Sequence, residues 1–134
     1  MLSVETVHHV ALTVTDIERA KRFYGEVLQL PEVARPDFDF GGAWYEIGGR
    51  EVHLIVHDDT RTQRGTTAID IKDGHFALRV RSYADALKHL QAHGVPYLAL
   101  PQNKTNWAQI YVTDPDGNVI ELNADRATIE PSRG

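Results

Sequence analysis

Hydrophobic and polar residues alternate with a period of two along four short stretches of the chain, which predicts four β-strands. In each stretch one histidine or glutamate has the parity opposite to the hydrophobic residues. Because successive side chains of a strand point to opposite faces, we expect the hydrophobic residues to pack a core and the polar ones to face a cavity. The four polar residues are His9, His53, His75 and Glu121.

The pattern between the first two of these strands predicts one helix and two further strands. Hydrophobic residues at helical spacing indicate a helix over 17–28, with Asp16 as its N-cap and Pro31 as its stop. Pairs of glycines then mark turns between strand-like stretches. These stretches lie near 32–38, 43–47 and 51–57.

The same order of elements returns after a polar segment. A strand is expected over 75–81, followed by a helix over 83–93 that begins after the N-cap candidate Ser82. Pro131 lies in a tail that is expected to be loose. The last three strands are expected near 97–100, 107–113 and 118–123.

The two halves are a repeat in architecture. In both halves seven residues separate the first-strand histidine from the helix cap. From that histidine to the polar residue of the last strand the interval is 44 residues in the first half and 46 in the second. We therefore predict an α+β fold of two β-α-β-β-β modules in a single domain. The modules are expected at about 5–58 and 73–124, with a linker at 59–72 and a loose tail at 125–134.

Composition and charge exclude several classes of protein. At 134 residues the chain is long enough for one compact domain. A net charge of −5, with no basic stripe, argues against nucleic-acid binding. The chain has no cysteine, no signal-peptide pattern and no hydrophobic run of the roughly 18 residues that a membrane helix needs. We therefore expect a cytoplasmic protein that does not associate with membranes.

Three imidazoles and one carboxylate on a shared face indicate a site for a divalent metal ion. Other side chains of the second half have the same phase and are candidates for binding a substrate. Arg79 is suited to a substrate carboxylate, and Trp107, Gln109 and Tyr111 share one face of their strand. Trp44 either joins this lining or belongs to the core.

Several segments between about residues 6 and 123 together carry a family pattern. They are His9–Val14 with Asp16, Phe23–Tyr24 with Val27–Leu28, Gly42–Trp44, His53–Ile55, Gly74–Leu78 and Tyr111–Leu122. On these segments the chain resembles the vicinal oxygen chelate superfamily. That superfamily includes glyoxalase I, methylmalonyl-CoA epimerase, fosfomycin-resistance enzymes, extradiol dioxygenases and bleomycin-resistance binding proteins.

The resemblance implies that His9, His75 and Glu121 bind one divalent ion, with His53 as a fourth ligand. The ion would be Zn, Ni, Mn, Fe or Co, and it would hold a small substrate through two neighbouring oxygens. The implied reaction is a proton transfer of isomerase or lyase type, with Glu121 as the candidate general base. The resemblance also implies a half-open barrel of mixed sheet around the metal cavity, completed in a homodimer.

Departures from the family pattern leave the reaction open. Glyoxalase I commonly has glutamate at the position of His53. The extradiol dioxygenase signature has a histidine in the stretch that is 102–104 here, and its absence disfavours ring cleavage. Only Lys104 is a candidate for the phosphonate-binding basic residues of the fosfomycin enzymes. The alternatives are a fosfomycin-type thiol or water transferase, an extradiol dioxygenase, and a metal-free protein that sequesters a small molecule or drug.

Overall fold

The computed structural model describes residues 1–58 and 64–131. The chain forms two compact units, residues 1–63 and 64–134. Parts of the predicted linker (59–63) and of the predicted tail (132–134) lie outside the described residues. Each unit is one β-α-β-β-β module and is described by itself.

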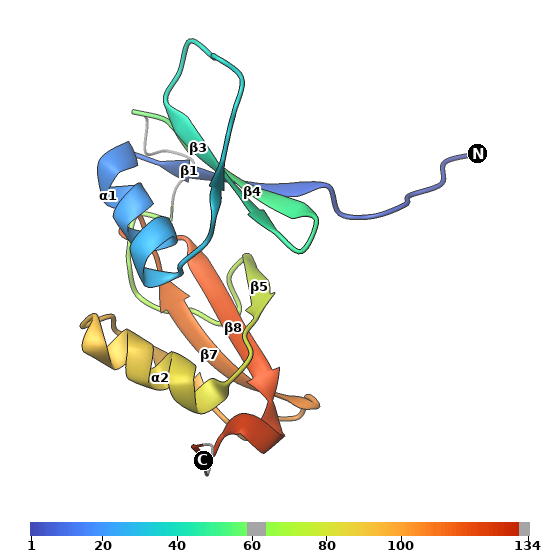
Figure 1. The fold of residues 1–134 in the computed structure, drawn as a ribbon, viewed down its shortest axis with the longest axis vertical. Helices are drawn as coiled ribbons and strands as arrows, with labels where there is room; N and C mark the ends of the chain where they lie inside the picture. The colour runs from blue at the N-terminus through green and yellow to red at the C-terminus, as the bar shows by residue number, and fades with distance from the viewer. Residues whose placement is uncertain (59–63, 132–134) are drawn as a thin grey trace. The chain divides into compact units, whose positions relative to one another are not determined.

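The first unit is a four-stranded mixed sheet with a helix on one face (Figure 1). The strand order is β1-β4-β3-β2, with β1 parallel to β4 and the other neighbours antiparallel. Its elements are β1 (His9–Val14), α1 (Ile17–Lys21), the π-helical turn η1 (Arg22–Val27), β2 (Glu32–Val33), β3 (Gly42–Ile47) and β4 (Arg50–Val56).

The second unit repeats this topology. The strand order is β5-β8-β7-β6, with β5 parallel to β8 and the other neighbours antiparallel. Its elements are β5 (His75–Arg79), α2 (Tyr83–Ala92), β6 (Leu98–Leu100), β7 (Trp107–Thr113), β8 (Val119–Asp125) and the 3-10 turn η3 (Arg126–Thr128). The predicted fold of two such modules with mixed sheets is confirmed.

Three boundaries differ from the prediction. The first helix becomes π-helical at Arg22, where the N–H of Leu28 binds the carbonyl of Phe23. The strand expected over 32–38 ends at Val33, and Pro36, which has no N–H for a ladder, lies within the part that is not paired. The tail expected to be loose from residue 125 begins as the end of β8 and the turn η3.

One face of each sheet packs a hydrophobic core under its helix. In the first unit Val14, Tyr45 and Leu54 are at most 1% exposed, and Tyr24 of η1 is fully buried. In the second unit the corresponding core contains Tyr83, Leu90, Ile110 and Ile120, which are also at most 1% exposed. The predicted alternation therefore decides which face of each strand is left to the polar residues.

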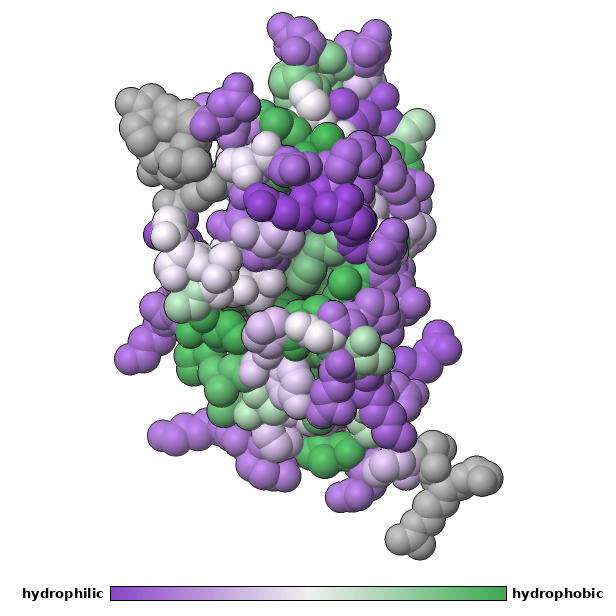
Figure 2. All heavy atoms as spheres, turned by 90° about the vertical axis from the view of Figure 1, so that its left-hand side faces the viewer, coloured by the Kyte–Doolittle hydropathy of each residue, from purple (hydrophilic) through white to green (hydrophobic). Residues whose placement is uncertain are grey.

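No helix in the described part of the chain has the length and hydrophobicity needed to cross a bilayer. On the face of the molecule in Figure 2, hydrophilic side chains cover most of the surface, and hydrophobic ones form smaller green areas between them.

The strand registers of the two modules are equivalent. His53 on β4 is the cross-strand partner of Ala11, two residues after His9. Glu121 on β8 is the partner of Ala77, which is likewise two residues after the histidine that begins β5. The same register places His53 and Glu121 at matching points of the two sheets.

Arg64 fastens the beginning of the second unit to its β7–β8 turn. Its guanidinium nitrogens donate to Asp73 Oδ2 at 2.6 Å, to the Gly117 carbonyl at 2.6 Å and to the Ala68 carbonyl at 2.7 Å. Gly117 has a φ of +90°, and a Cβ at this position would overlap the carbonyl oxygen of Thr66. Glycine is therefore required here both by its backbone conformation and by the close approach of segment 64–73.

We expect Gly117→Ala to lower the free energy of unfolding by about 3 kcal/mol or more, because positive φ and backbone overlap add. Gly94→Ala is the matched control: its φ is +65° but no atom lies within 4 Å of a built Cβ. The control should lose only about 1 kcal/mol. Urea denaturation measures both, and equal losses would show that the packing of segment 64–73 on Gly117 is unimportant.

A second prediction concerns Tyr45, which is 1% exposed and whose hydroxyl has no hydrogen-bond partner among the described residues. Burial, and secondarily the charge of Glu32, raise its pKa to about 12. Tyr45→Phe should raise the free energy of unfolding at pH 7 by about 1 kcal/mol, because an unpaired buried hydroxyl is removed.

The pH dependence of that variant follows from the same pKa. The Tyr45 phenol ionises near pH 10 in the unfolded chain but near pH 12 in the folded protein. Between these pH values the unfolded chain releases the proton more readily, so ionisation of Tyr45 lowers the wild-type free energy of unfolding as the pH rises from 10 to 12. Tyr45→Phe should lose less stability over this interval, measured by urea denaturation at pH 7 and pH 11. A variant less stable than wild type at pH 7 would contradict the prediction.

Candidate functional site

Glu121 is the centre of a polar cluster on the face of the second sheet opposite its hydrophobic core. Its side chain is 7% exposed and lies beside residues of the same parity on β7 and β8. Tyr111 donates its hydroxyl to Oε1 at 2.9 Å and Gln109 donates its amide to Oε1 at 3.3 Å, while Asn123 donates to Oε2 at 2.7 Å. The cross-strand neighbours therefore orient both carboxylate oxygens.

His75 faces this carboxylate from β5. Its Nδ1 lies 2.8 Å from the Asp73 carbonyl oxygen, and because a carbonyl only accepts, Nδ1 carries the proton. In the neutral ring Nε2 is then a lone pair, and it lies 3.6 Å from Glu121 Oε1. That distance exceeds the hydrogen-bond range, so the Nε2 lone pair faces a carboxylate oxygen that accepts its hydrogen bonds from Tyr111 and Gln109.

An imidazole nitrogen beside a carboxylate is a pair of donor groups suited to a divalent cation. First-row divalent ions bind imidazole nitrogen and carboxylate oxygen at about 2.1 Å, so two atoms bound to one ion at octahedral or tetrahedral angles lie roughly 3 to 3.4 Å apart. His75 Nε2 and Glu121 Oε1 are 3.6 Å apart, so a small side-chain movement would bring both to one ion. The carbonyl bond at Nδ1 is the kind of outer partner that fixes a ligand histidine in one tautomer.

The partners of this pair are themselves held. The Asp73 carboxylate accepts from Arg64, and this hydrogen bond lowers the pKa of Asp73. Burial, then the hydrogen bond to Glu121 and the charge of that carboxylate, raise the pKa of Tyr111 to about 12. Tyr111 is therefore a protonated phenol at neutral pH and can act as a donor.

The first sheet carries a different cluster at the matching place. The His53 ring stacks on His9 with ring centroids 4.1 Å apart and on Trp44 with centroids 3.9 Å apart and planes 5° from parallel. His53 is 7% exposed. Its Nε2 lies 2.8 Å from Glu51 Oε1, and His9 Nδ1 lies 2.9 Å from His8 Nδ1.

The structure thus brings the four predicted ligands together in two pairs. His9 and His53 meet in the first unit, and His75 and Glu121 meet in the second. Within the described residues, no group of three or more histidine, aspartate or glutamate side chains is arranged to hold an ion. Each unit by itself therefore provides a pair of ligand-type side chains.

The other predicted site residues differ in their contacts. Tyr111 and Gln109 bind Glu121, and Trp44 stacks on His53 rather than filling the core. Arg79 shares the face of His75 and is exposed. The Trp107 indole nitrogen is buried without a partner among the described residues.

Two residues of the site were not anticipated from the sequence. Glu51 binds His53, and Asn123 binds Glu121. Each lies two residues from a predicted ligand on the same strand, and therefore on the same face. That spacing was the available signal.

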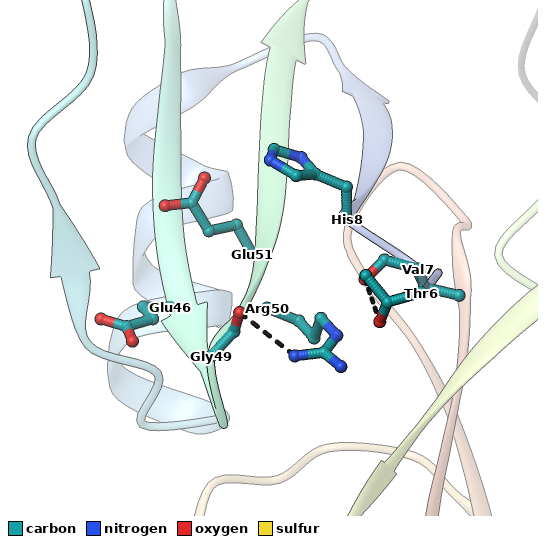
Figure 3. A pocket seen from close by; sticks show the side chains of 7 residues that line it. All are labelled: Thr6, Val7, His8, Glu46, Gly49, Arg50 and Glu51. Carbon is teal, nitrogen blue, oxygen red and sulfur yellow. Dashed lines mark hydrogen bonds between the residues drawn. The ribbon is translucent and has the colours of Figure 1, made fainter. Parts of the chain in front are cut away.

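A pocket of about 200 Å³ adjoins the first cluster. In Figure 3, Glu51 of β4 and His8, which precedes β1, both line it, and Arg50 donates a hydrogen bond to the Gly49 carbonyl. Thr6, Val7 and Glu46 complete its lining. The pocket is lined by charged groups of both signs. One of them, Glu51, is also hydrogen-bonded to His53.

Comparison with known proteins adds a family to this geometry. The family model described as "Glyoxalase/Bleomycin resistance protein/Dioxygenase superfamily" matches residues 6–122. The chain is 28% identical over 137 residues to Glyoxylase I 4 of Arabidopsis thaliana, covering 99% of this chain and 79% of the relative. It is 28% identical over 119 residues to Glutathione transferase FosA of Serratia marcescens, covering 89% and 80%.

A solved structure shares the fold. It is a mutant of the fosfomycin resistance protein FosX from Listeria monocytogenes, complexed with Mn(II) and 1S,2S-dihydroxypropylphosphonic acid. It matches with a TM-score of 0.72 at 18% identity, covering 92% of this chain and 94% of that one. At this identity the match supports the fold alone.

Proposed function

Because this chain belongs to the Glyoxalase/Bleomycin resistance protein/Dioxygenase superfamily, we propose that it is a divalent-metal-dependent enzyme acting on a small substrate with two neighbouring oxygens. The proposed reaction is a proton transfer of isomerase or lyase type. The proposed ligands are His9, His53, His75 and Glu121. Glyoxylase I 4 and Glutathione transferase FosA, to which the chain is similar, have the names of enzymes, and this similarity supports an enzymatic function.

One observation carries the proposal. His75 Nε2 and Glu121 Oε1 face one another at 3.6 Å, and the Asp73 carbonyl holds the histidine proton on the opposite nitrogen. The separation lies beyond the hydrogen-bond range, and both atoms are of the kinds that bind a first-row divalent ion. The manganese ion of the FosX complex makes a divalent metal reasonable for this fold.

The roles of the residues follow from their contacts. A divalent ion bound here would supply a Lewis acid that stabilises negative charge on the substrate oxygens. Glu121 is the proposed general base, since a carboxylate in this cluster can accept a proton from the substrate. Gln109 and Asn123 keep its oxygens oriented, and the Tyr111 phenol provides a donor beside them.

We further infer that the complete set of ligands forms when the first module of one chain pairs with the second module of another. Each module contributes two of the four proposed ligands, which lie close together within it. Closed two-fold dimers are the commonest assembly and would form two such sites. The registers of the two sheets are equivalent, so the ligand positions of the two modules correspond.

A fosfomycin-type transfer of a thiol or water to an epoxide is the second candidate. It is favoured by the similarity to Glutathione transferase FosA and by the Tyr111 hydroxyl beside Glu121. One divalent ion held by the same ligands would serve both reactions, so the ligand set does not distinguish the two reactions.

The test of the proposed reaction uses protein loaded with Mn²⁺, Ni²⁺, Zn²⁺, Co²⁺ or Fe²⁺ and a panel of hemithioacetal, epoxide and catechol substrates. Proton transfer is expected to introduce solvent deuterium into the product in D₂O. Consumption of a thiol with the epoxide would replace the proposed reaction by the transferase, and consumption of O₂ would replace it by the oxygenase. Binding of substrates with no turnover by any loaded form would contradict an enzymatic function.

A further inference from the structure

The two modules surround their equivalent positions with opposite chemistry. In the second module Tyr111 is the cross-strand partner of Glu121, and Asn123 follows two residues along β8. Both donate hydrogen bonds to the carboxylate. A carboxylate in this position is therefore surrounded by donors, as an acceptor-only group requires.

In the first module the corresponding positions hold groups suited to an imidazole. Trp44 is the cross-strand partner of His53 and stacks on its ring, whereas Ile55 occupies the place that Asn123 has in the second module. Neither side chain supplies the donors that surround Glu121. The two modules therefore differ in the ligand candidate and also in the side chains around it.

The first module has a carboxylate at a position where the second module has a hydrophobic residue. Glu51 is the cross-strand partner of His9, and the equivalent partner of His75 in the second module is Val119. Glu51 Oε1 lies 2.8 Å from His53 Nε2, and the Glu51 side chain is 30% exposed toward the adjoining pocket. A carboxylate accepts but does not donate, so His53 donates its Nε2 proton in this contact.

We propose that Glu51 is a positioning residue that selects the tautomer of His53. With the proton on Nε2 held by Glu51, the lone pair of the neutral ring is on Nδ1, and the stacked planes of Trp44 and His9 fix the ring's orientation. Glu51 then plays for His53 the part that the Asp73 carbonyl plays for His75. The importance of this tautomer for metal binding rests on the proposed function.

Glu51 also supplies a negative charge beside a ligand position that is occupied by a histidine and not by a second acidic residue. Glu51 brings a carboxylate beside the imidazole without occupying the ligand position itself. Glu46 lies directly across from Glu51 on β3 and lines the same pocket, but it has no hydrogen bond to His53 among the described contacts. Glu46 is therefore the matched control for a carboxylate at this place.

The first measurement is made on metal-free protein at about pH 8, where histidine is normally neutral. Long-range ¹H–¹⁵N spectra should show the His53 proton on Nε2 in wild type and in Glu46→Ala. Glu51→Ala should show a mixture of tautomers, and Glu51→Gln should restore Nε2–H because its amide oxygen still accepts. An unchanged His53 tautomer in Glu51→Ala would overturn the proposal.

The second measurement is the affinity for Mn²⁺, determined by chelator competition for the single variants and for Glu51→Ala/His53→Ala. Glu51→Ala should weaken binding by roughly 10- to 100-fold, and Glu46→Ala should not. In the His53→Ala background, Glu51→Ala should have no further effect, because its influence passes through His53. A further loss in that background would show that Glu51 binds the ion directly and would overturn the positioning role.

The two measurements separate the two proposals. Wild-type protein that binds no divalent ion would refute the proposed function. The tautomer spectra need no metal, so they decide the Glu51–His53 arrangement whatever the metal titration gives. The Trp44 ring centroid lies 3.9 Å from that of His53, so ion binding should change the Trp44 fluorescence. Trp44→Phe, which keeps Trp107, should lack this ion-dependent change.

Discussion

Glu121→Gln is expected to abolish turnover and to weaken divalent-ion binding by more than the roughly 100-fold that loss of an outer partner costs. The variant removes the negative charge and the candidate general base while keeping the size of the side chain. Metal affinity by chelator competition and steady-state turnover measure the two effects. Both effects should appear together, because one carboxylate is proposed to serve as ligand and base.

Glutamine also has a local structural cost at this position. Its amide nitrogen cannot accept the hydrogen bond from Asn123 that the carboxylate accepts at 2.7 Å, so a loss of about 1 kcal/mol in the free energy of unfolding is expected. His93→Ala, at the exposed end of α2, is the control for removing an unrelated metal-binding side chain. A Glu121→Gln protein that is folded and keeps wild-type metal affinity would exclude Glu121 as a ligand.

His9→Ala and His75→Ala are each expected to be inactive alone and to regain activity when the two proteins are unfolded and refolded together. If ligands come from opposite modules of two chains, a mixed dimer contains one intact site and one site lacking both histidines. Random pairing makes half of the dimers mixed, so about a quarter of wild-type activity should return. The enzyme assay of the refolded mixture measures this directly.

The control for that experiment is a mixture of His75→Ala with Glu121→Ala, two changes in the same module. Every site contains the second module of one of these two chains, and that module is mutated in both. No dimer therefore has an intact site, and no activity should return. Recovery in the control, or its absence from the His9/His75 mixture, would contradict a site shared between chains.

The fold was predictable from the sequence because period and parity are local properties. The alternation around His9 and His75 fixed which face of each strand is polar, and the repeat spacing gave two modules, as the sheets confirm. Element boundaries were less predictable. The π-helical turn after Lys21 depends on how Phe23 and Tyr24 pack against the sheet, which no local pattern encodes.

The candidate site was predictable as a set of positions but not as a network. Parity placed Tyr111 and Gln109 on the face of Glu121, and the structure shows their hydrogen bonds to it. Trp44 could not be assigned between core and site, because its stacking on His53 depends on the register of β3 with β4. Glu51 was missed because a glutamate beside a predicted ligand resembles any solvated strand residue.

Elemental analysis of protein purified without added chelator tests the central claim most directly. We expect about one divalent ion per chain in wild type, and almost none in His75→Ala and Glu121→Ala, since each variant removes one of the two facing ligand atoms. Equal metal content in all three proteins would contradict the assignment of His75 and Glu121 as ligands.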